Sequence, residues 1–332
     1  MGFETQDVER KVLSILRVLN ESEESLGARV IAQRLKKHGV ELGERAVRYH
    51  LKLTDEKGLT RLVGRRDGRV LTDLGKQEIK SALVKDKIGF AISRIELLAF
   101  RTGFDTEKRS GLLPVNVSFY HRKKFSKALQ AMRPAFEAGI CVSNLVATAS
   151  EGERLGELLV PEGRIGLATV CSIVINGCLL KAGVPMDSRF GGLLQIRNRQ
   201  PFRFAELIHY AGCSLDPTEI FIMAKMTSVG AVARRGEGNI LANFREIPAL
   251  CRPVAEQVVA KLRDAGIGGL LVMGETSEPV CEVLVEPNKI GIILIGGLNP
   301  VAAAQEAGIE AENRAMSTIM EYRDLVKFDE LG

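Results

Sequence analysis

The stretch LTRLVGRRDGRVLTDLG at residues 59–75 decides the fold of the first part of this chain. Its two short runs with apolar residues flank Asp67-Gly68, and an Asp-Gly pair between such runs signals a β-hairpin because its second residue takes a positive φ. Upstream, apolar residues at helical spacing predict three helices, the first ending near Asn20 and the others over 27–37 and 43–57. Three helices and then a hairpin is the order of a winged helix, which we expect over residues 1–85.

The third predicted helix and the hairpin tip carry the residues expected to contact DNA. In a winged helix the third helix enters the major groove, and the hairpin tip lies along a phosphate backbone. Ala46, Leu53 and either Tyr49 or His50 are expected to face the core. Arginine can bond the edge of a guanine bidentately, whereas phosphate contacts set affinity without reading sequence. The expected DNA contacts are Arg45, Arg48 and Lys52 on the helix and Arg65, Arg66 and Arg69 at the tip.

The distribution of charge favours a polyanionic partner for this part of the chain. Residues 1–85 hold 18 Lys and Arg against 13 Asp and Glu, while the remaining residues balance, so the whole net charge of +5 lies in the first quarter. An alternative is that the basic residues are only the solvated face of a small domain that docks another protein.

The bulk composition is that of a globular protein with more than one domain. The chain has 332 residues, of which 45% are hydrophobic and 26% charged. Its start is charged and helix-like, and no apolar run is long enough to span a bilayer, so we expect a cytoplasmic protein with no membrane partner. The six cysteines are scattered without metal-ligand spacing, which predicts reduced thiols and no metal. No nucleotide-loop, nucleophile-elbow or zinc-protease motif is present, so no catalytic residue or cofactor is assigned.

A self-match at an offset of 125 residues indicates that the second part of the chain is duplicated. GELLVPEGRIG at 156–166 lies over CEVLVEPNKIG at 281–291, and KAGV at 181–184 lies over EAGI at 306–309. We expect two copies, 112–208 and 238–331, within a regulatory domain at 112–332, preceded by a coupling segment at 86–111. The copies are joined by a stretch that includes the strand-like TEIFIMAKMTSVGAV at 218–232.

Each copy reads strand, helix, strand, strand, helix, strand. This βαββαβ order is that of a ferredoxin-like fold. The predicted fold class is therefore a winged helix, mostly α with a β-wing, followed by an α+β domain of two ferredoxin-like repeats.

A ligand is expected where each copy turns from its third strand into its second helix. The turns lie within ATVCSIVINGCLLKAG and ILIGGLNPVAAAQEAG, and a helix N-terminus offers unpaired N–H groups that suit a carboxylate or phosphate. The alternative is that small residues stand there only for backbone geometry and close packing. The candidate contacts are Thr169, Cys171, Ser172 and Asn176 in the first copy and Gly296, Gly297 and Asn299 in the second.

The chain resembles the NrpR family of nitrogen-regulation repressors. The resemblance rests on the winged helix, on IGFAISRIELLAFRT at 88–102, and above all on ATVCSIVINGCLLKAGVP at 168–185 and IGGLNPVAAAQEAGIE at 295–310. It implies a repressor of nitrogen-assimilation genes that releases its operator when 2-oxoglutarate binds, with residues 169–172 in the effector-responsive region.

The expected partners are therefore double-stranded operator DNA, a small dicarboxylate and a second copy of the chain. Ligand binding at the repeat interface would change the distance between the two readers of a homodimer, with residues 86–104 as the coupling element. Three alternatives are an RNA-associated module, an enzyme that acts on a small carboxylate and carries a winged helix, and a structural interaction protein.

Overall fold

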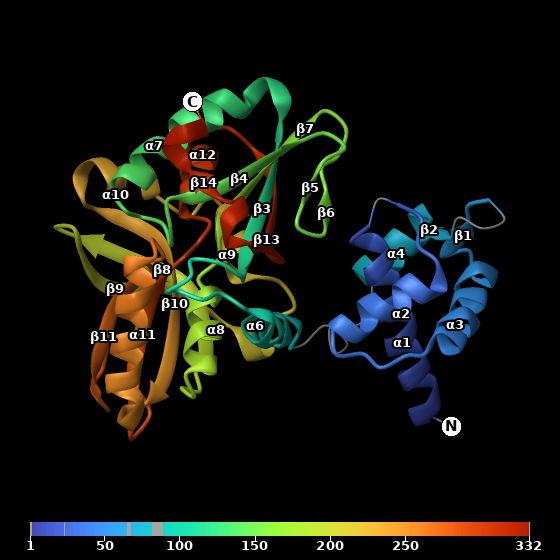
Figure 1. Cartoon of the computed structure of the whole chain (residues 1–332), viewed down its shortest axis with the longest axis horizontal. Coiled ribbons are helices and arrows are strands. Elements are labelled where there is room, and N and C mark those ends of the chain that lie inside the picture. Colours follow the sequence, from blue (N-terminus) through green and yellow to red (C-terminus); the bar gives the residue numbers. More distant parts are fainter. Residues whose placement is uncertain (1, 23, 65–67, 82–88, 332) are drawn as a thin grey trace. The chain divides into compact units, whose positions relative to one another are not determined.

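The computed structural model describes residues 2–22, 24–64, 68–81 and 89–331 (Figure 1). The chain divides into two compact units, Met1–Ile88 and Gly89–Gly332, and each is described by itself. The first unit contains α1 (Gly2–Asn20), α2 (Ala28–Lys37), α3 (Glu44–Glu56), β1 (Thr60–Leu62), β2 (Arg69–Leu71) and α4 (Asp73–Ser81).

The first unit is a winged helix with a small helical core. The buried residues of this core are Ile15, Val18, Leu19, Leu26, Ile31, Leu35, Val47 and Leu51. The strands β1 and β2 pair antiparallel as the wing, with Thr60 opposite Leu71. Gly68 has φ 88°, and a Cβ there would lie 2.4 Å from the carbonyl carbon of Leu26, so only glycine fits this end of the hairpin. Its partner in the predicted turn, Asp67, lies outside the described residues.

The second unit repeats one set of elements after an additional first helix, α6 (Phe90–Arg101). The first copy contains β3 (Leu112–His121), α7 (Phe125–Glu137), β4 (Leu145–Ser150), β5 (Arg154–Leu155), β6 (Leu158–Leu159), β7 (Arg164–Val170), α8 (Ile173–Lys181) and β8 (Asp187–Arg197). The second contains β10 (Gly238–Pro248), α11 (Arg252–Asp264), β11 (Leu270–Thr276), β12 (Lys289–Ile295), α12 (Asn299–Glu306), β13 (Ala311–Glu321) and β14 (Val326–Lys327). The offset of 125 residues found in the sequence superposes β4 on β11 and β7 on β12.

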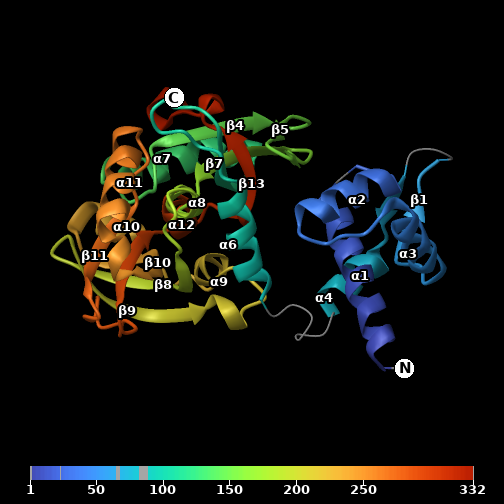
Figure 2. The ribbon, with the colours of Figure 1, turned by 60° about the horizontal axis from the view of Figure 1, so that its bottom comes forward.

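The two copies exchange their last long strands. One five-stranded sheet has the order β13-β3-β7-β4-β14, and the other has the order β11-β12-β10-β8-β9, where β9 is Gln200–His209. All neighbouring strands are antiparallel. Figure 2 shows β8 of the first copy between β9 and β10 in the sheet of the second copy. The copies are therefore not two self-contained ferredoxin-like units, because each sheet is completed by the other copy.

The segment that joins the copies is helical where a strand was predicted. Residues 218–223 lie in α9 (Pro217–Met223) and residues 229–232 in α10 (Val229–Arg235), with a short irregular connection between them. The side chain of Asp216 accepts the backbone N–H of Thr218 and caps α9, and Pro217 stands at its first turn. This cap and proline impose a helical start that overrides the β-propensity of the apolar residues after it.

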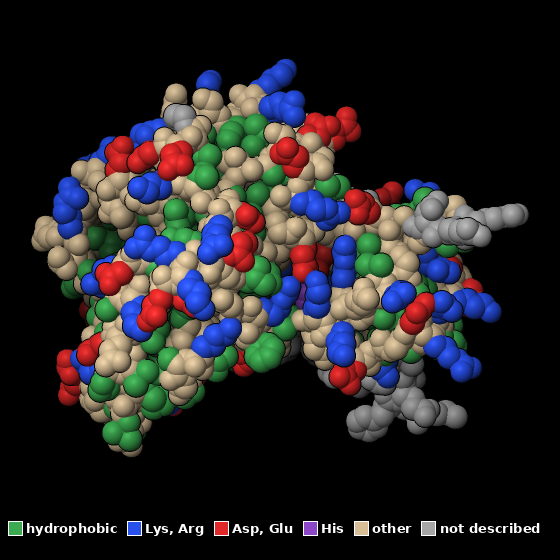
Figure 3. All heavy atoms as spheres, viewed as in Figure 1, with side chains coloured by type: hydrophobic (Ala, Val, Ile, Leu, Met, Phe, Trp, Pro, Cys, Tyr) green, Lys and Arg blue, Asp and Glu red, His purple; other side chains and the backbone are tan. Residues whose placement is uncertain are grey.

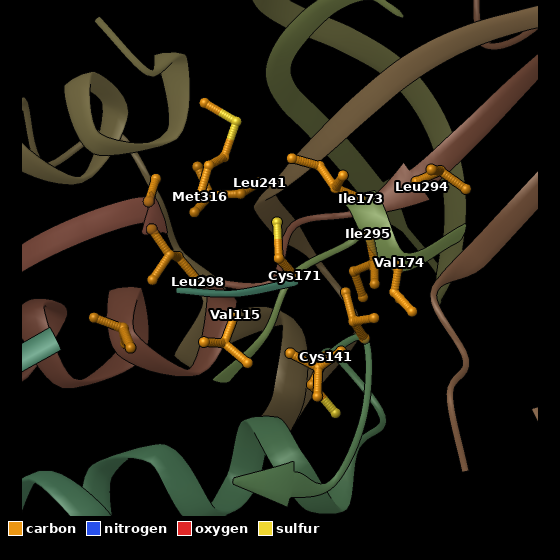
Figure 4. Packing of buried hydrophobic residues seen from close by; sticks show 14 of the residues in the cluster. Val115, Cys141, Cys171, Ile173, Val174, Leu241, Leu294, Ile295, Leu298 and Met316 are labelled. Atoms are coloured by element: carbon orange, nitrogen blue, oxygen red, sulfur yellow. The ribbon is translucent and has the colours of Figure 1, made fainter. Parts of the chain in front are cut away.

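Apolar residues of both copies form one continuous core. Figure 4 shows Cys171 and Val115 of the first copy near Leu241, Leu298 and Met316 of the second. The two copies therefore share a buried junction, and polar groups placed there are enclosed by both.

Candidate functional site

The third helix of the first unit presents a basic face away from the core. The buried side of α3 consists of Val47, His50, Leu51 and Thr54. Ala46 and Leu53, which were expected to face the core, are only partly buried, so the apolar side of the helix is rotated by one residue from the predicted one. Arg45, Arg48 and Lys52 are all exposed on the other side, as their spacing predicts. Of the two alternatives for the core, His50 is buried and Tyr49 is 61% exposed. Tyr49 therefore lies within the basic face, where the sequence reasoning did not place it.

Two of the basic side chains on this face have acidic neighbours one turn away. Arg48 pairs with Glu44, and the Lys52 Nζ lies 3.8 Å from a carboxylate oxygen of Glu56. All four side chains are well exposed, and ion pairs of this kind are weak enough to be exchanged for a phosphate or a base. Figure 3 shows Lys and Arg side chains spread over the visible face of this unit with Asp and Glu among them.

The wing arginines differ in their surroundings. The Nε of Arg69 donates to a carboxylate oxygen of Asp55 at 2.7 Å, and both side chains are less than a third exposed. This bond ties β2 to α3, so Arg69 holds the wing in place instead of standing at its tip as predicted. Arg65 and Arg66 lie outside the described residues. Arg61, which the sequence reasoning did not select, is exposed on β1.

A small cavity with several polar side chains in its wall lies where the two copies meet. It has a volume of about 20 Å³, room for about one water. The first copy contributes Asn116, Cys171, Ser172 and Ile173; the joining segment contributes Tyr210, Asp216 and Thr218; the second copy contributes Asn243, Arg245, Gly297, Leu298, Ala315 and Met316. Any larger ligand therefore needs these three parts of the chain to move apart.

The main charged group of this cavity is a buried arginine. Arg245, on β10, is 1% exposed, and its Nε and Nη1 have no hydrogen-bond partner among the described residues. Its guanidinium lies over the ring of Tyr210, 4.9 Å from the ring centre. Burying a cation whose N–H groups lack acceptors costs free energy, because hydrogen bonds to the protein do not replace those lost to water. Such a group suits an anion that enters the cavity.

The other polar groups of the wall form a connected set. The hydroxyl of Tyr210 donates to Asn243, and the side-chain N–H of Asn243 donates to the hydroxyl of Ser172 at 3.2 Å. Burial raises the pKa of the Asp216 carboxyl, while hydrogen bonds from Thr218 and Glu219 and the charge of Arg245 act to lower that pKa. An anion at Arg245 would repel the ionised Asp216, so the same site favours protonated Asp216 when it is filled.

The predicted ligand contacts fall into two groups. Cys171, Ser172 and Gly297 line the cavity. Burial raises the pKa of the Cys171 thiol to about 12, so Cys171 stays neutral there. Thr169 and Asn176 are buried without lining the cavity, although Thr169 Oγ1 and Asn176 Oδ1 have no hydrogen-bond partner in the described part of the chain.

Asn299 and Gly296 serve the backbone instead of the cavity. The side-chain oxygen of Asn299 accepts from Leu241 N at 2.8 Å, and its Nδ2 donates to Leu241 O at 2.9 Å and to Gly296 O at 3.1 Å. A Cβ on Gly296 would lie 2.7 Å from that of Leu241. The expectation that these two residues contact the effector is therefore corrected: they hold α12 against β10.

We expect Asn299→Ala and Asn176→Ala to differ in their effects on stability. Asn299→Ala leaves the Leu241 N–H without its side-chain acceptor in a site that water does not reach, which should lower the free energy of unfolding by about 2–3 kcal/mol. Asn176 makes one bond of 3.2 Å, to Ser188, and its removal also deletes a partnerless oxygen, so about 1 kcal/mol or less is expected. Urea unfolding measures both; equal losses would contradict these roles.

Glu219 gives the second unit a pH-dependent stability. This residue of α9 accepts the backbone N–H of Ala315. Burial and the neighbouring Asp216 raise the pKa of Glu219 to about 7, while the Ala315 N–H, Arg94 and Arg314 act to lower it. The folded chain therefore binds more protons than the unfolded chain between about pH 4.5 and 7. Stability falls as pH rises through this window.

Glu219→Gln should flatten this part of the stability profile. Glutamine keeps an oxygen that accepts the Ala315 N–H but does not ionise, so a loss of about 3 kcal/mol between pH 4.5 and 8 should disappear. Urea unfolding at several pH values measures the slope, with Glu137→Gln, an exposed carboxylate on α7, as the control. A profile as steep in Glu219→Gln as in the unchanged chain would refute the assignment.

A winged helix joined to a larger duplicated α+β unit is an arrangement typical of a DNA-binding transcriptional regulator. Residues 88–327 match the family model described as NrpR regulatory domains NRD1 and 2, and residues 13–79 match the ribonuclease R winged-helix domain. The chain belongs to the NrpR family, which is a family of regulators and not of enzymes.

Individual relatives agree with this membership. The chain is 42% identical to "Global nitrogen regulator NrpRI" of Methanosarcina mazei, over 96% of this chain and 98% of that protein. It is 30% identical to "Global nitrogen regulator NrpR" of Methanococcus maripaludis over 95% of this chain, but it spans only 55% of that longer protein.

A solved structure extends the likeness to the fold. The crystal structure of a nitrogen repressor-like protein from Methanococcus jannaschii matches with a TM-score of 0.62 and 26% identity, covering 73% of this chain and 99% of that chain. Among the described residues, no helix is long and apolar enough to cross a membrane, and no group of three or more His, Cys, Asp or Glu is arranged to hold a metal ion.

Proposed function

We propose that this chain is a DNA-binding transcriptional regulator that represses nitrogen-assimilation genes in the cytoplasm and is relieved by 2-oxoglutarate. The names of the relatives support the nitrogen-regulatory role, and the basic face of α3 supports DNA binding. The observation that carries the ligand part is the buried guanidinium of Arg245, with two partnerless nitrogens on the wall of a polar cavity.

The chemistry of the cavity suits a small dicarboxylate. A carboxylate can take two parallel N–H bonds from a guanidinium, which are the strongest hydrogen bonds that a protein offers it. The hydroxyl of Ser172 and the side-chain amides of Asn116 and Asn243 then remain for the second carboxylate and the keto oxygen. 2-Oxoglutarate, the effector implied by the family resemblance, presents these groups.

The proposed mechanism couples ligand size to the arrangement of the copies. The cavity is smaller than a dicarboxylate, so binding favours a state in which the two copies stand further apart. In a homodimer, this change alters the spacing of the two winged helices and hence the fit to a two-fold operator. In each sheet, four strands follow the order of a ferredoxin-like fold: β13-β3-β7-β4 in one sheet and β11-β12-β10-β8 in the other. We propose that each copy derives from a ferredoxin-like unit whose last strand was exchanged with that of the other copy. The ligand shifts the equilibrium only by its differential affinity for the two states.

Thermal unfolding and gel shifts with genomic operator fragments test this function together. At about a hundred times its dissociation constant, 2-oxoglutarate should stabilise the protein by about 2.7 kcal/mol and release the DNA. Glutamate, in which an ammonium replaces the keto oxygen, serves as the control and should do neither at the same concentration. Unchanged melting and unchanged DNA binding at millimolar 2-oxoglutarate would rule the proposal out.

A second candidate follows from the match of the first unit to the winged helix of ribonuclease R. That unit would then bind structured RNA instead of duplex DNA. Competition between operator duplex and a hairpin RNA at several salt concentrations separates the two, because the DNA reader keeps a preference for one duplex sequence when phosphate contacts weaken.

A further inference from the structure

We infer that Arg94 of α6 is the positioning residue that transmits occupancy of the cavity to the reader. The inference rests on the proposed function and concerns the regulation of the same cavity. Its structural basis is a bulge in β13, residues 315–317, which forms part of the cavity wall and is held by side chains from several elements.

The bulge places three residues of β13 opposite one residue of β3. Arg314 pairs with Val117 and Thr318 with Val115, so Asn116 alone faces residues 315–317. Met316, in the middle, has φ 49°, a conformation that non-glycine residues adopt at a cost in free energy. Because this conformation is costly, it depends on the neighbouring groups that hold the segment, and displacing those neighbours should change it.

Side chains hold the backbone groups of the bulge. The Ala315 N–H donates to Glu219 of α9, and the Met316 N–H donates to the Asn116 side-chain oxygen at 3.0 Å. The Nε of Arg94 donates to the Met316 carbonyl at 2.6 Å and its Nη2 to the Ser317 carbonyl at 2.9 Å. Arg94 thus clamps two successive carbonyls with its planar fork, an arrangement that a lysine cannot reproduce.

The clamp connects the ligand site to the start of the second unit. Ala315 and Met316 line the cavity, as does Asn116, which holds the Met316 N–H. A ligand larger than the cavity displaces this wall, and the two carbonyls move with it. Because Arg94 is fixed to both, α6 follows, and α6 is the first described element after the reader. The sequence reasoning placed a coupling element at residues 86–104, and Arg94 gives it a specific contact.

Loss of the Arg94 contacts should reduce the coupling free energy between effector binding and DNA binding. The coupling free energy is the difference in effector affinity between the DNA-bound and the DNA-free protein, and it equals the difference in DNA affinity with and without effector. Removing a transmitting residue reduces both differences together. The affinity for DNA alone should stay close to that of the unchanged protein, because Arg94 belongs to the second unit. The affinity for effector alone can shift, since Arg94 holds a wall residue, so the quantity that reports transmission is the ratio of DNA affinities without and with saturating effector.

The experiment measures operator affinity with and without 2-oxoglutarate for the full chain and for Arg94→Met, Arg94→Lys and Arg101→Met. Arg101 lies on the same helix and pairs with Glu157 at 3.0 Å without contacting the bulge, so it is the matched control. In the unchanged chain and in Arg101→Met, effector should weaken DNA binding by a factor in the usual range of roughly 5 to 150. At effector concentrations that calorimetry shows to be saturating for each variant, Arg94→Met should show less than about a twofold change in DNA affinity, and Arg94→Lys an intermediate response.

Two results overturn the inference, and they are distinguishable. If the unchanged chain binds effector without any change in DNA affinity, the proposed function and the inference both fail. If the unchanged chain responds and Arg94→Met responds equally, only the inference fails. If Arg94→Met does not fold, Arg94→Lys provides the test. If effector weakens DNA binding by Arg94→Lys as much as it does for Arg101→Met, the two carbonyl contacts of Arg94 do not transmit the signal.

Discussion

Arg245→Met should abolish effector binding without lowering stability. The side chain is 1% exposed and two of its nitrogens have no hydrogen-bond partner among the described residues, so the proposed carboxylate of the ligand would supply their hydrogen bonds. Losing a buried charge-assisted pair costs about 2–5 kcal/mol of binding free energy, which corresponds to a loss of affinity of at least about 30-fold. Calorimetric titration with 2-oxoglutarate measures this loss directly.

The stability of the same variant separates binding from folding. Methionine fills most of the volume of arginine and removes the desolvation penalty of a buried cation, which should stabilise the fold by about 1–4 kcal/mol. The lost stacking on Tyr210 is worth up to about 2 kcal/mol, so the net change should be near zero or favourable. Urea unfolding without ligand measures it. A marked loss of stability would mean that Arg245 is a structural residue and not a ligand contact.

Arg189→Met provides the matched control, with the opposite pattern. Arg189 on β8 lies 2.6 Å from Glu286 and 3.5 Å from the buried carboxylate of Glu246, and the carboxyl of Glu286 raises the pKa of Arg189. Its removal should weaken the fold, because Glu246 is 1% exposed and would keep only Lys289 at 3.3 Å as its cation. Effector affinity should be retained, since Arg189 does not line the cavity.

Arg45→Ala combined with Arg48→Ala should lower operator affinity by at least about 30-fold, because each bidentate contact to a base discriminates by about 1–3 kcal/mol. The slope of log affinity against log salt should also become shallower if either residue neutralises a phosphate, by about 0.9 for each lost contact. Gel shifts over a salt series measure both quantities. Effector binding to the free protein should not change.

The control for the reader variant is Arg234→Ala combined with Arg235→Ala. Both residues are exposed at the end of α10 in the second unit, so the change in net charge is the same. An equal loss of DNA affinity in the control would show that net charge alone governs binding, and a full affinity in the reader variant would remove α3 from the interface.

The sequence was sufficient where the signal was local or periodic. Apolar spacing and terminal glycines predicted α2 and α3 almost to the residue, and Gly39 and Gly58 have the positive φ that ends those helices. The offset of 125 residues predicted which strands of the two copies correspond, because equivalent elements keep equivalent apolar patterns. Three of the expected effector contacts, Cys171, Ser172 and Gly297, line one cavity, although their role as ligand contacts stays a prediction.

The sequence was insufficient where pairing is non-local. The sheets of the two copies have similar edges. No local sequence pattern therefore shows whether β8 pairs within the first copy or with β10 of the second copy, as it does in the structure. The sequence analysis did not select Arg245, because the burial of its side chain depends on that exchange and on residues next to α9. One signal was present and unused: Asp216-Pro217 is a cap and first-turn pair, which predicts a helix where the apolar residues suggested a strand.

The most direct test of the account is the affinity of the full chain for operator DNA over a salt series, with and without saturating 2-oxoglutarate. We expect the affinity for DNA to fall steeply with salt and the effector to lower it at every salt concentration. Neutralising Arg45, Arg48, Arg65 and Arg66 together should make the salt dependence much shallower. A DNA affinity that changes neither when effector is added nor when these four arginines are neutralised would contradict the proposed function.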